Sequence, residues 1–297
     1  MTALAVPVPA GGTPSGTGGT GRAVRRPHRV ALVVWGLAVT AAAVYLVWLH
    51  SLADEARGGT SACAVPPADG LPSCASVAAI TADDVYGGGI SLVAGALAHL
   101  VLPVAAWAGA ALVARELETG TAHFAWTQGV SPTRWLAARL AVPAALLTAG
   151  TGTLVLLHVW ARGDGDPNLV GDWYHPDVFI ATGPACVAYA LAALALGALI
   201  GLLVRRTLPA AGLTFAACLV LHNVMTRFRE DLWPTVTRTG GGELPRSAFT
   251  VAWSERSTAF HPRSHYWPLQ FMETGLLLTV TAVATTAAFR LLRRRTA

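Results

Sequence analysis

The chain has 297 residues, of which 54% are hydrophobic and only 12% are charged, and its mean hydropathy is +0.51. This composition excludes a water-soluble domain of ordinary make-up and indicates a protein of the lipid bilayer. All 21 basic residues are arginine, so the sequence contains no lysine. It therefore cannot contain an ATP-binding motif of the G-x-x-x-x-G-K-[ST] type, nor a Schiff-base lysine.

Six apolar runs are long enough to cross the hydrocarbon core as helices. They cover residues 30–49, 90–114, 136–160, 178–204, 208–225 and 267–292. The predicted fold class is therefore an all-α membrane protein with six transmembrane helices. We divide the chain into a basic N-terminal segment (1–29) that is too polar to fold, a six-helix membrane domain (30–292) and a basic tail (293–297).

Arginine is distributed unevenly between the two sides of this predicted fold. The segments on the side of the N-terminus hold 13 arginines and only two acids, Glu116 and Glu118. Those arginines are Arg22, Arg25, Arg26, Arg29, Arg115, Arg134, Arg139, Arg205, Arg206, Arg290, Arg293, Arg294 and Arg295. Because basic residues of short loops stay inside the cell, we expect both termini in the cytoplasm and a multi-pass protein of the plasma membrane. The basic total thus reflects membrane orientation, and we predict no nucleic-acid partner.

The first span and the loop after it raise two questions of processing. Ser51-Leu52-Ala53 resembles a signal-peptide cleavage site, but the apolar run before it exceeds a usual signal-peptide core, so we expect the span to be retained. Cys63 and Cys74 follow in a Pro- and Gly-rich outer loop. In an oxidising compartment they could form a disulfide, and two free thiols are the alternative.

Between the second and third spans the sequence predicts a long helix, a short helix and another long helix. Gly120 and Gly129 suit the left-handed position that ends a helix, so they bracket a short helix from Thr121 to Gln128. The Ser131-Pro132 pair is typical of the start of the next helix. Because a helix of about eight residues is unstable alone in water, another surface must hold this one.

The short helix displays two aromatic side chains, Phe124 and Trp126. Glu116 and Glu118 lie in the last turn of the helix before it, where the helix dipole disfavours acids. Acids in that position suggest cations on a neighbouring surface. An ordinary connecting loop with solvated charges is the alternative interpretation.

The loop between the third and fourth spans starts like an EF-hand calcium loop, with Asp164, Asp166 and Asn168 at alternate positions. Leu169 stands where such a loop needs glycine, and His175 stands where it needs the bidentate glutamate. We therefore predict a solvated turn and no metal site.

The fourth span carries small residues at four-residue spacing, namely Ala193, Gly197 and Gly201. Such a face lets another helix approach closely, either within one subunit or across a dimer. Arg205 and Arg206 end this span, and the next helix restarts directly after them. The two spans are therefore predicted to form a tight hairpin.

Ionisable side chains inside spans are candidates for function, because charge is costly in lipid. They are His99, His158, His222 and Glu273, with Gln270 one turn before Glu273. Counted from the predicted helix ends, all lie in the outer half of the bilayer and can line one cavity. For His158 and His222 we favour simple contact with lipid headgroups. Glu273 needs a partner or a proton, and we predict a histidine or amide partner within an outer-half cluster of His99, Gln270 and Glu273.

Three stretches together resemble permease subunits of ABC type-2 exporters, in the branch common in GC-rich bacteria. The most specific lies in residues 115–140 and contains E-L-E-T-G-T, W-T-Q-G-V-S and R-W-L-A, followed by Arg139. The stretches RRTLPAAGLT (205–214) and YWPLQFMETGLLL (266–278) support it. Together with the helix order, the resemblance covers most of the chain after residue 28.

The resemblance implies that the short helix is a coupling helix, which docks on a separate ATP-hydrolysing subunit. The residues implied in docking are Glu116, Glu118, Thr121, Phe124, Trp126 and Gln128. The chain would then be a transporter subunit without its own catalytic site or cofactor, with ATP-Mg bound by the partner and a second permease copy or paralogue completing a dimer. The resemblance also implies short re-entrant helices in residues 227–266, which the sequence itself leaves open.

A membrane enzyme that binds haem or a metal inside the bilayer is the alternative function. Paired intramembrane histidines can ligate haem, and His99 with either His158 or His222 would supply such a pair. The sequence contains no G-x-S-x-G, C-x-x-C or H-E-x-x-H motif, however. We therefore favour the permease.

Overall fold

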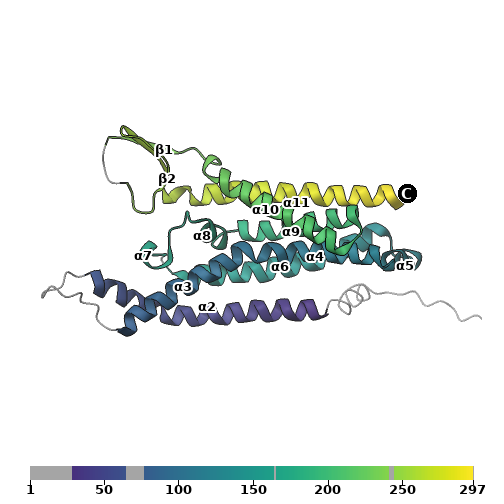
Figure 1. Cartoon of the computed structure of the whole chain (residues 1–297), viewed down its shortest axis with the longest axis horizontal. Helices are drawn as coiled ribbons and strands as arrows, with labels where there is room; N and C mark the ends of the chain where they lie inside the picture. The colour runs from purple at the N-terminus through teal and green to yellow at the C-terminus, as the bar shows by residue number, and fades with distance from the viewer. Residues whose placement is uncertain (1–28, 65–76, 164, 241–243, 297) are drawn as a thin grey trace, which may run out of the picture.

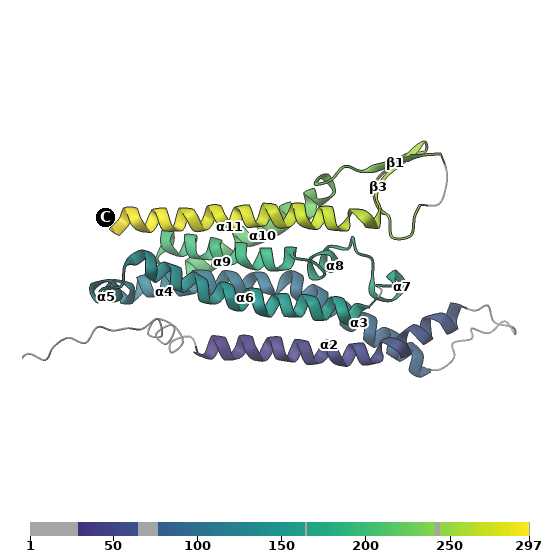
Figure 2. The same cartoon turned by 180° about the vertical axis from the view of Figure 1, so that it is seen from behind.

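The computed structural model describes residues 29–64, 77–163, 165–240 and 244–296. These residues form an elongated bundle of helices with a small sheet at one end (Figures 1 and 2). The predicted disulfide between Cys63 and Cys74 falls outside the side chains that the structure describes.

The long helices run along the bundle, and the short ones lie at its two ends. The helices are α2 (Arg29–Ala64), α3 (Val77–His99), α4 (Val101–Glu118), α5 (Thr121–Thr127), α6 (Pro132–Arg162), α7 (Pro167–Val170), α8 (Pro176–Ala181), α9 (Ala185–Val204), α10 (Thr207–Phe228) and α11 (Tyr266–Thr296). Two 3-10 turns, η1 (Arg229–Asp231) and η2 (Arg263–His265), connect the bundle to the sheet.

Six helical segments of the described chain are long and apolar enough to cross a membrane. They are Val30–Arg57, Ala82–Glu118, Pro132–Arg162, Ala185–Val204, Thr207–Asp231 and Arg263–Thr296. They correspond one for one to the predicted apolar runs, so the prediction of a six-helix, multi-pass membrane protein is confirmed. The second segment comprises α3 and α4 and is interrupted at Leu100, where Pro103 has no N–H to bond to the carbonyl of His99 one turn earlier.

The two ends of the bundle differ in what they carry (Figure 1). One end, called the α5 end below, holds α5, the start of α2 and the end of α11. The opposite end, called the sheet end, holds α7, α8 and the strands (Figures 1 and 2). The loop that contains α5 and the segment that contains the strands thus lie at opposite ends of the bundle.

The central contact of the bundle is the crossing of α4 and α9, where glycines allow the two backbones to touch. A Cβ atom on Gly109 would lie 2.3 Å from the Leu194 carbonyl oxygen, and one on Gly197 would lie 2.7 Å from that of Ala106. Gly201 lies in similar contact with α4, and Ala193 is buried on the same helix. The small-residue face of α9 therefore packs within the subunit.

The segment after η1 forms a three-stranded antiparallel sheet, in the order β1-β3-β2. Its strands are β1 (Val236–Thr239), β2 (Phe249–Trp253) and β3 (Ser257–His261). Their β-branched and aromatic residues favour extended backbone over helix. In the described part of 227–266, this sheet stands where the resemblance implied re-entrant helices. The all-α fold class is accordingly corrected to a helical bundle with a small sheet.

The sheet is attached to the bundle through the loop between α7 and α8. Trp173 Nε1 donates a hydrogen bond to the Ser247 carbonyl at 2.8 Å, and the Tyr174 ring stacks on Phe249 with centroids 5.3 Å apart. The central strand β3 has a second attachment, because the buried His261 donates through Nε2 to the Glu230 carbonyl of η1 at 2.9 Å. The sheet is therefore fixed through β2 to the loop between α7 and α8 and through β3 to η1.

Candidate functional site

The short helix α5 is bracketed as the sequence predicts. Gly120 before it and Gly129 after it both have positive φ angles, +73° and +86°. The side chain of Ser131 accepts a hydrogen bond from the Arg134 N–H at 3.4 Å, which caps the start of α6. The helix itself ends at Thr127, one residue before the predicted end.

The surface that holds α5 belongs to the same chain. Ala122 is fully buried, and it shares an apolar cluster with Trp135 and Leu136 of α6 and Leu292 of α11. The Trp126 ring packs against this cluster and meets the Trp135 ring edge-on, with centroids 5.7 Å apart. Trp126 is therefore an anchor of α5 to its own subunit.

Both acids that precede α5 have partners within the chain. Glu116 forms an ion pair with Arg139 at 2.5 Å and accepts a hydrogen bond from Trp135 Nε1 at 2.8 Å. Glu118 accepts from the backbone N–H of Thr207 at 2.9 Å and from its hydroxyl at 2.6 Å, so it caps the start of α10. Arg139 of α6 thus supplies the expected cation beside Glu116, whereas Glu118 is bonded by the uncharged donors of Thr207 on α10. These two acids therefore connect α4 to both helices.

The outward face of α5 consists of residues at helical spacing. Thr121, Phe124 and Gln128 are all exposed and lie three or four residues apart, and the Phe124 side chain is 65% exposed. Of the six residues implied in docking, these three are exposed, although the Thr121 hydroxyl donates to the Glu116 carbonyl at 3.3 Å. The side chains of Trp126, Glu116 and Glu118 are held by contacts within the subunit. The surface of α5 that is left for a partner is therefore smaller than the six-residue set predicted from the sequence.

A buried ion pair occupies the sheet end. Arg229 of η1 donates to both carboxylate oxygens of Glu273 on α11, at 2.7 and 3.1 Å. The hydroxyl of Tyr189 on α9 donates to the same carboxylate at 2.7 Å. The guanidinium also lies over the Phe179 ring, 4.1 Å from its centroid. Glu273 is thus satisfied by charge and hydrogen bonds from two other elements.

This arrangement corrects the predicted partner of Glu273. The partner is an arginine that the sequence placed in the outer loop, together with a tyrosine hydroxyl, and among the described residues no histidine or amide is hydrogen-bonded to the carboxylate. Gln270 makes different contacts, because it donates to the Phe179 carbonyl and accepts from the Ala185 N–H, and it thereby bridges the break between α8 and α9. Gln270 and Glu273 thus have different hydrogen-bond partners, and His99 is connected to Glu273 through the rings of His222 and Tyr189.

The histidines also differ from the prediction. His158 is fully buried, and its Nε2 donates to the Ile90 carbonyl of α3 at 3.2 Å. His222 is buried too, with its ring 5.6 Å from Tyr189 and 5.2 Å from His99. The headgroup interpretation of His158 and His222 is wrong because both rings are buried inside the bundle, His158 against α3 and His222 against Tyr189 of α9. His99 reaches the surface, 3.8 Å from Asp177.

These positions do not suit a haem. The rings of His99 and His222 contact each other directly, which leaves no room for a porphyrin plane between them. His158 uses its Nε2 on the Ile90 carbonyl, so this nitrogen is not free to ligate a haem iron. The histidine pairs that the sequence offered for haem ligation therefore do not fit the group.

The model of one family, described as ABC-2 membrane transporter related, matches residues 35–229, which is well over half of the chain. The chain belongs to this family. No curated protein and no solved structure matches it. The match begins within α2, includes α5, and ends at Arg229, so the sheet and α11 of the permease lie beyond it.

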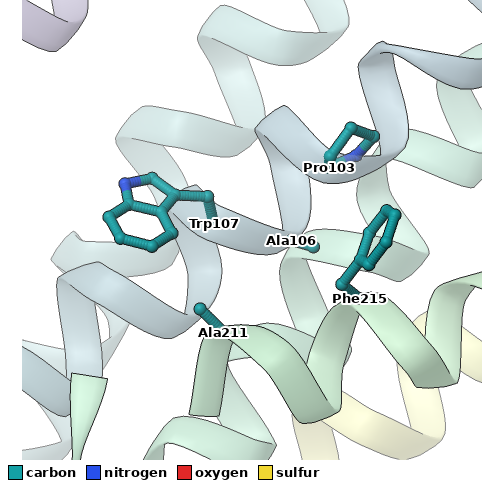
Figure 3. Close-up of a pocket in the computed structure, with 5 residues that line it drawn as sticks. All are labelled: Pro103, Ala106, Trp107, Ala211 and Phe215. Carbon is teal, nitrogen blue, oxygen red and sulfur yellow. The ribbon is translucent and has the colours of Figure 1, made fainter. Parts of the chain in front are cut away.

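The permease also presents an apolar hollow on the outside of the bundle, between α4 and α10 (Figure 3). Its volume is about 290 Å³, and it is lined by Pro103, Ala106, Trp107, Ala211 and Phe215. Trp107 and Phe215 stand at its two sides, with the alanines between them. The hollow has no charged lining residue, so it suits an apolar surface or lipid chain.

The two partners of Glu273, Arg229 and Tyr189, were not predicted from the sequence. Arg229 follows a span directly and is one of several arginines of the outer segment, while Tyr189 lies in an otherwise apolar run and resembles a packing residue. The available signal was Glu273 itself, because a buried carboxylate requires a cation or a strong donor. That requirement does not choose among the arginines of the segment.

Proposed function

We propose that the permease is the transmembrane subunit of an ATP-driven exporter in the plasma membrane, and that a separate ATPase subunit docks on α5. The observation that carries this proposal is the exposed Phe124 on a helix whose inner side is anchored to its own subunit. Exposed aromatic side chains on a rigid support are typical hot spots of protein interfaces. The docking face is formed by Thr121, Phe124 and Gln128.

The anchoring of α5 supports a role in transmitting force. Trp126 contacts α6, Glu116 joins α4 to α6, and Glu118 joins α4 to α10. A displacement of α5 by a partner would therefore move the ends of three spanning helices together. A loosely attached loop would not transmit such a displacement.

The composition supports a partner that hydrolyses ATP. Since the chain has no lysine, it cannot form the lysine-dependent phosphate loop, and energy from ATP must reach it through contact with another subunit. The arginines concentrated at the α5 end favour a cytoplasmic location for α5, which is where an ATPase would meet it.

We further propose that the apolar face formed by α4 and α10 meets a second permease copy or paralogue. This proposal is supported by Trp107, which is half exposed beside the hollow with small residues around it. Small residues let helices of neighbouring subunits approach closely in a membrane, and the exposed Trp107 ring beside them offers a large apolar contact. A cysteine at position 215 should then form a cross-link between two permease chains under mild oxidation.

The docking proposal is tested with Phe124→Ala. Tagged permease is purified from native membranes, and the ATPase that accompanies the wild type is quantified in the variant. Loss of a hot-spot aromatic should weaken the association by about 30-fold, so that little ATPase is retained. Trp253→Ala is the matched control, since Trp253 is 75% exposed on β2 at the opposite end. Full retention of the ATPase by Phe124→Ala would refute docking on α5.

A further inference from the structure

A groove runs along the outside of α9 and α11 at the α5 end. It has a volume of about 640 Å³, and its apolar lining includes Leu203, Val283, Ala287 and Leu291. Leu203 and Val283 are 52% and 64% exposed. The alanine beside them is too short to fill the space between the two helices. The groove is therefore an open apolar channel on the membrane-facing side of the bundle.

The end of this channel nearest the C-terminus of α11 is cationic. Arg290 and Arg294 line the groove and lie one helical turn apart, so both guanidinium groups are on the same face of α11. Within the described part of the chain, neither makes an ion pair or a side-chain hydrogen bond. Arg295 differs from them, because it donates to the Leu202 carbonyl and ties α11 to α9.

We propose that this α9–α11 groove binds one anionic phospholipid, with the headgroup at Arg290 and Arg294 and an acyl chain between Leu203 and Val283. Guanidinium groups bind phosphate oxygens through paired hydrogen bonds, which suits a lipid whose net charge is negative. Positive side chains next to a spanning helix lie at the level of the headgroups. The order of apolar channel and cationic end along the groove thus matches the order of acyl chain and headgroup in a lipid.

A second permease copy is a poorer occupant of this groove. Two copies related by symmetry would bring the same arginines close to one another, which would repel and would bury unpaired charge. A lipid supplies the missing negative charge and fills the channel at the same time. This inference concerns lipid binding alone, and its test does not depend on transport or on the ATPase.

The test measures bound lipid directly. Permease is reconstituted in vesicles of equal parts phosphatidylglycerol and phosphatidylethanolamine, extracted in mild detergent, and examined by native mass spectrometry. The wild type should retain one phosphatidylglycerol. Because each arginine near an anionic surface contributes about a fivefold factor in binding, Arg290→Gln with Arg294→Gln should retain this lipid roughly 25-fold less tightly.

Two comparisons separate a specific site from general attraction of lipid. Arg134→Gln with Arg293→Gln removes the same charge at the same end, outside the groove lining, and should retain the lipid. Val283→Trp should expel the lipid by filling the channel, whereas Leu37→Trp on the exposed face of α2 should not. Equal retention by all four variants, or equal retention of the two lipids by the wild type, would overturn the proposal. So would a change of oligomeric state in Val283→Trp without loss of lipid.

Discussion

Arg229 and Glu273 form a bidentate ion pair inside the protein, although the sheet lies between them in the sequence. Arg229 Nε lies 2.7 Å from one carboxylate oxygen and Nη2 lies 3.1 Å from the other. Both side chains are buried, and the pair joins the end of α10 to α11. It therefore closes the segment that carries β1, β2 and β3 at its base, and Tyr189 extends the connection to α9.

Glu273→Gln should destabilise the permease strongly. The variant leaves the Arg229 guanidinium buried without its counter-charge, which typically costs about 3–5 kcal/mol in the free energy of unfolding. The measurement is unfolding of the purified protein in detergent, followed by tryptophan fluorescence. Loss of transport in this variant would then accompany loss of stability.

The double variant Arg229→Gln with Glu273→Gln is the control for that prediction. It removes both charges while leaving groups that can still hydrogen-bond, so it should be more stable than Glu273→Gln alone. If the two substitutions simply add, the ion pair does not behave as a coupled unit and the interpretation is wrong.

Gly197→Ala should disturb the crossing of α4 and α9. A Cβ at this position would lie 2.7 Å from the Ala106 carbonyl oxygen, so the helices must separate, at a cost of about 1–3 kcal/mol. Gly212→Ala on α10 is the matched control, because a Cβ there has no atom within 4 Å. The readout is the apparent melting temperature of each purified variant. Equal values for the two variants would show that the contact is less tight than the structure indicates.

Trp126→Ala and Phe124→Ala should separate stability from docking. Trp126 packs on Trp135, so its truncation should lower the free energy of unfolding by roughly 2 kcal/mol. Phe124 makes no comparable contact, and its truncation should leave unfolding unchanged while releasing the ATPase. Unfolding measurements on both variants check this. A destabilised Phe124→Ala would mean that this side chain also belongs to the packed cluster.

Cysteine labelling should establish the orientation. In a background without the native cysteines, Trp253→Cys at the sheet end should react with a membrane-impermeant maleimide in intact cells. Gln128→Cys at the α5 end should react only after the cells are opened, because the arginine distribution favours a cytoplasmic α5 end. The reverse pattern would exclude docking of a cytoplasmic ATPase on α5.

Local sequence was sufficient to predict the six spanning segments of this protein. The bilayer thickness fixes how long an apolar run must be to cross as a helix, so length and composition alone identify the six segments. The limits of α5 and the start of α6 were equally predictable, since Gly120, Gly129 and Ser131 act through their own backbone and neighbouring groups. The start and end of a helix depend on residues only a few positions apart, which is why the sequence alone predicts them.

Only the tertiary structure decided which side chains meet. The sequence showed that Glu273 needed a partner, but Arg229 reaches it only because the fold brings η1 and α11 together at the base of the segment that carries the sheet. Likewise, both aromatics of α5 were equally plausible contacts, and the position of α6 decided that Trp126 faces inward while Phe124 faces outward. Such contacts arise from the packing of distant segments, and a local pattern cannot encode them because it does not specify which helix lies alongside.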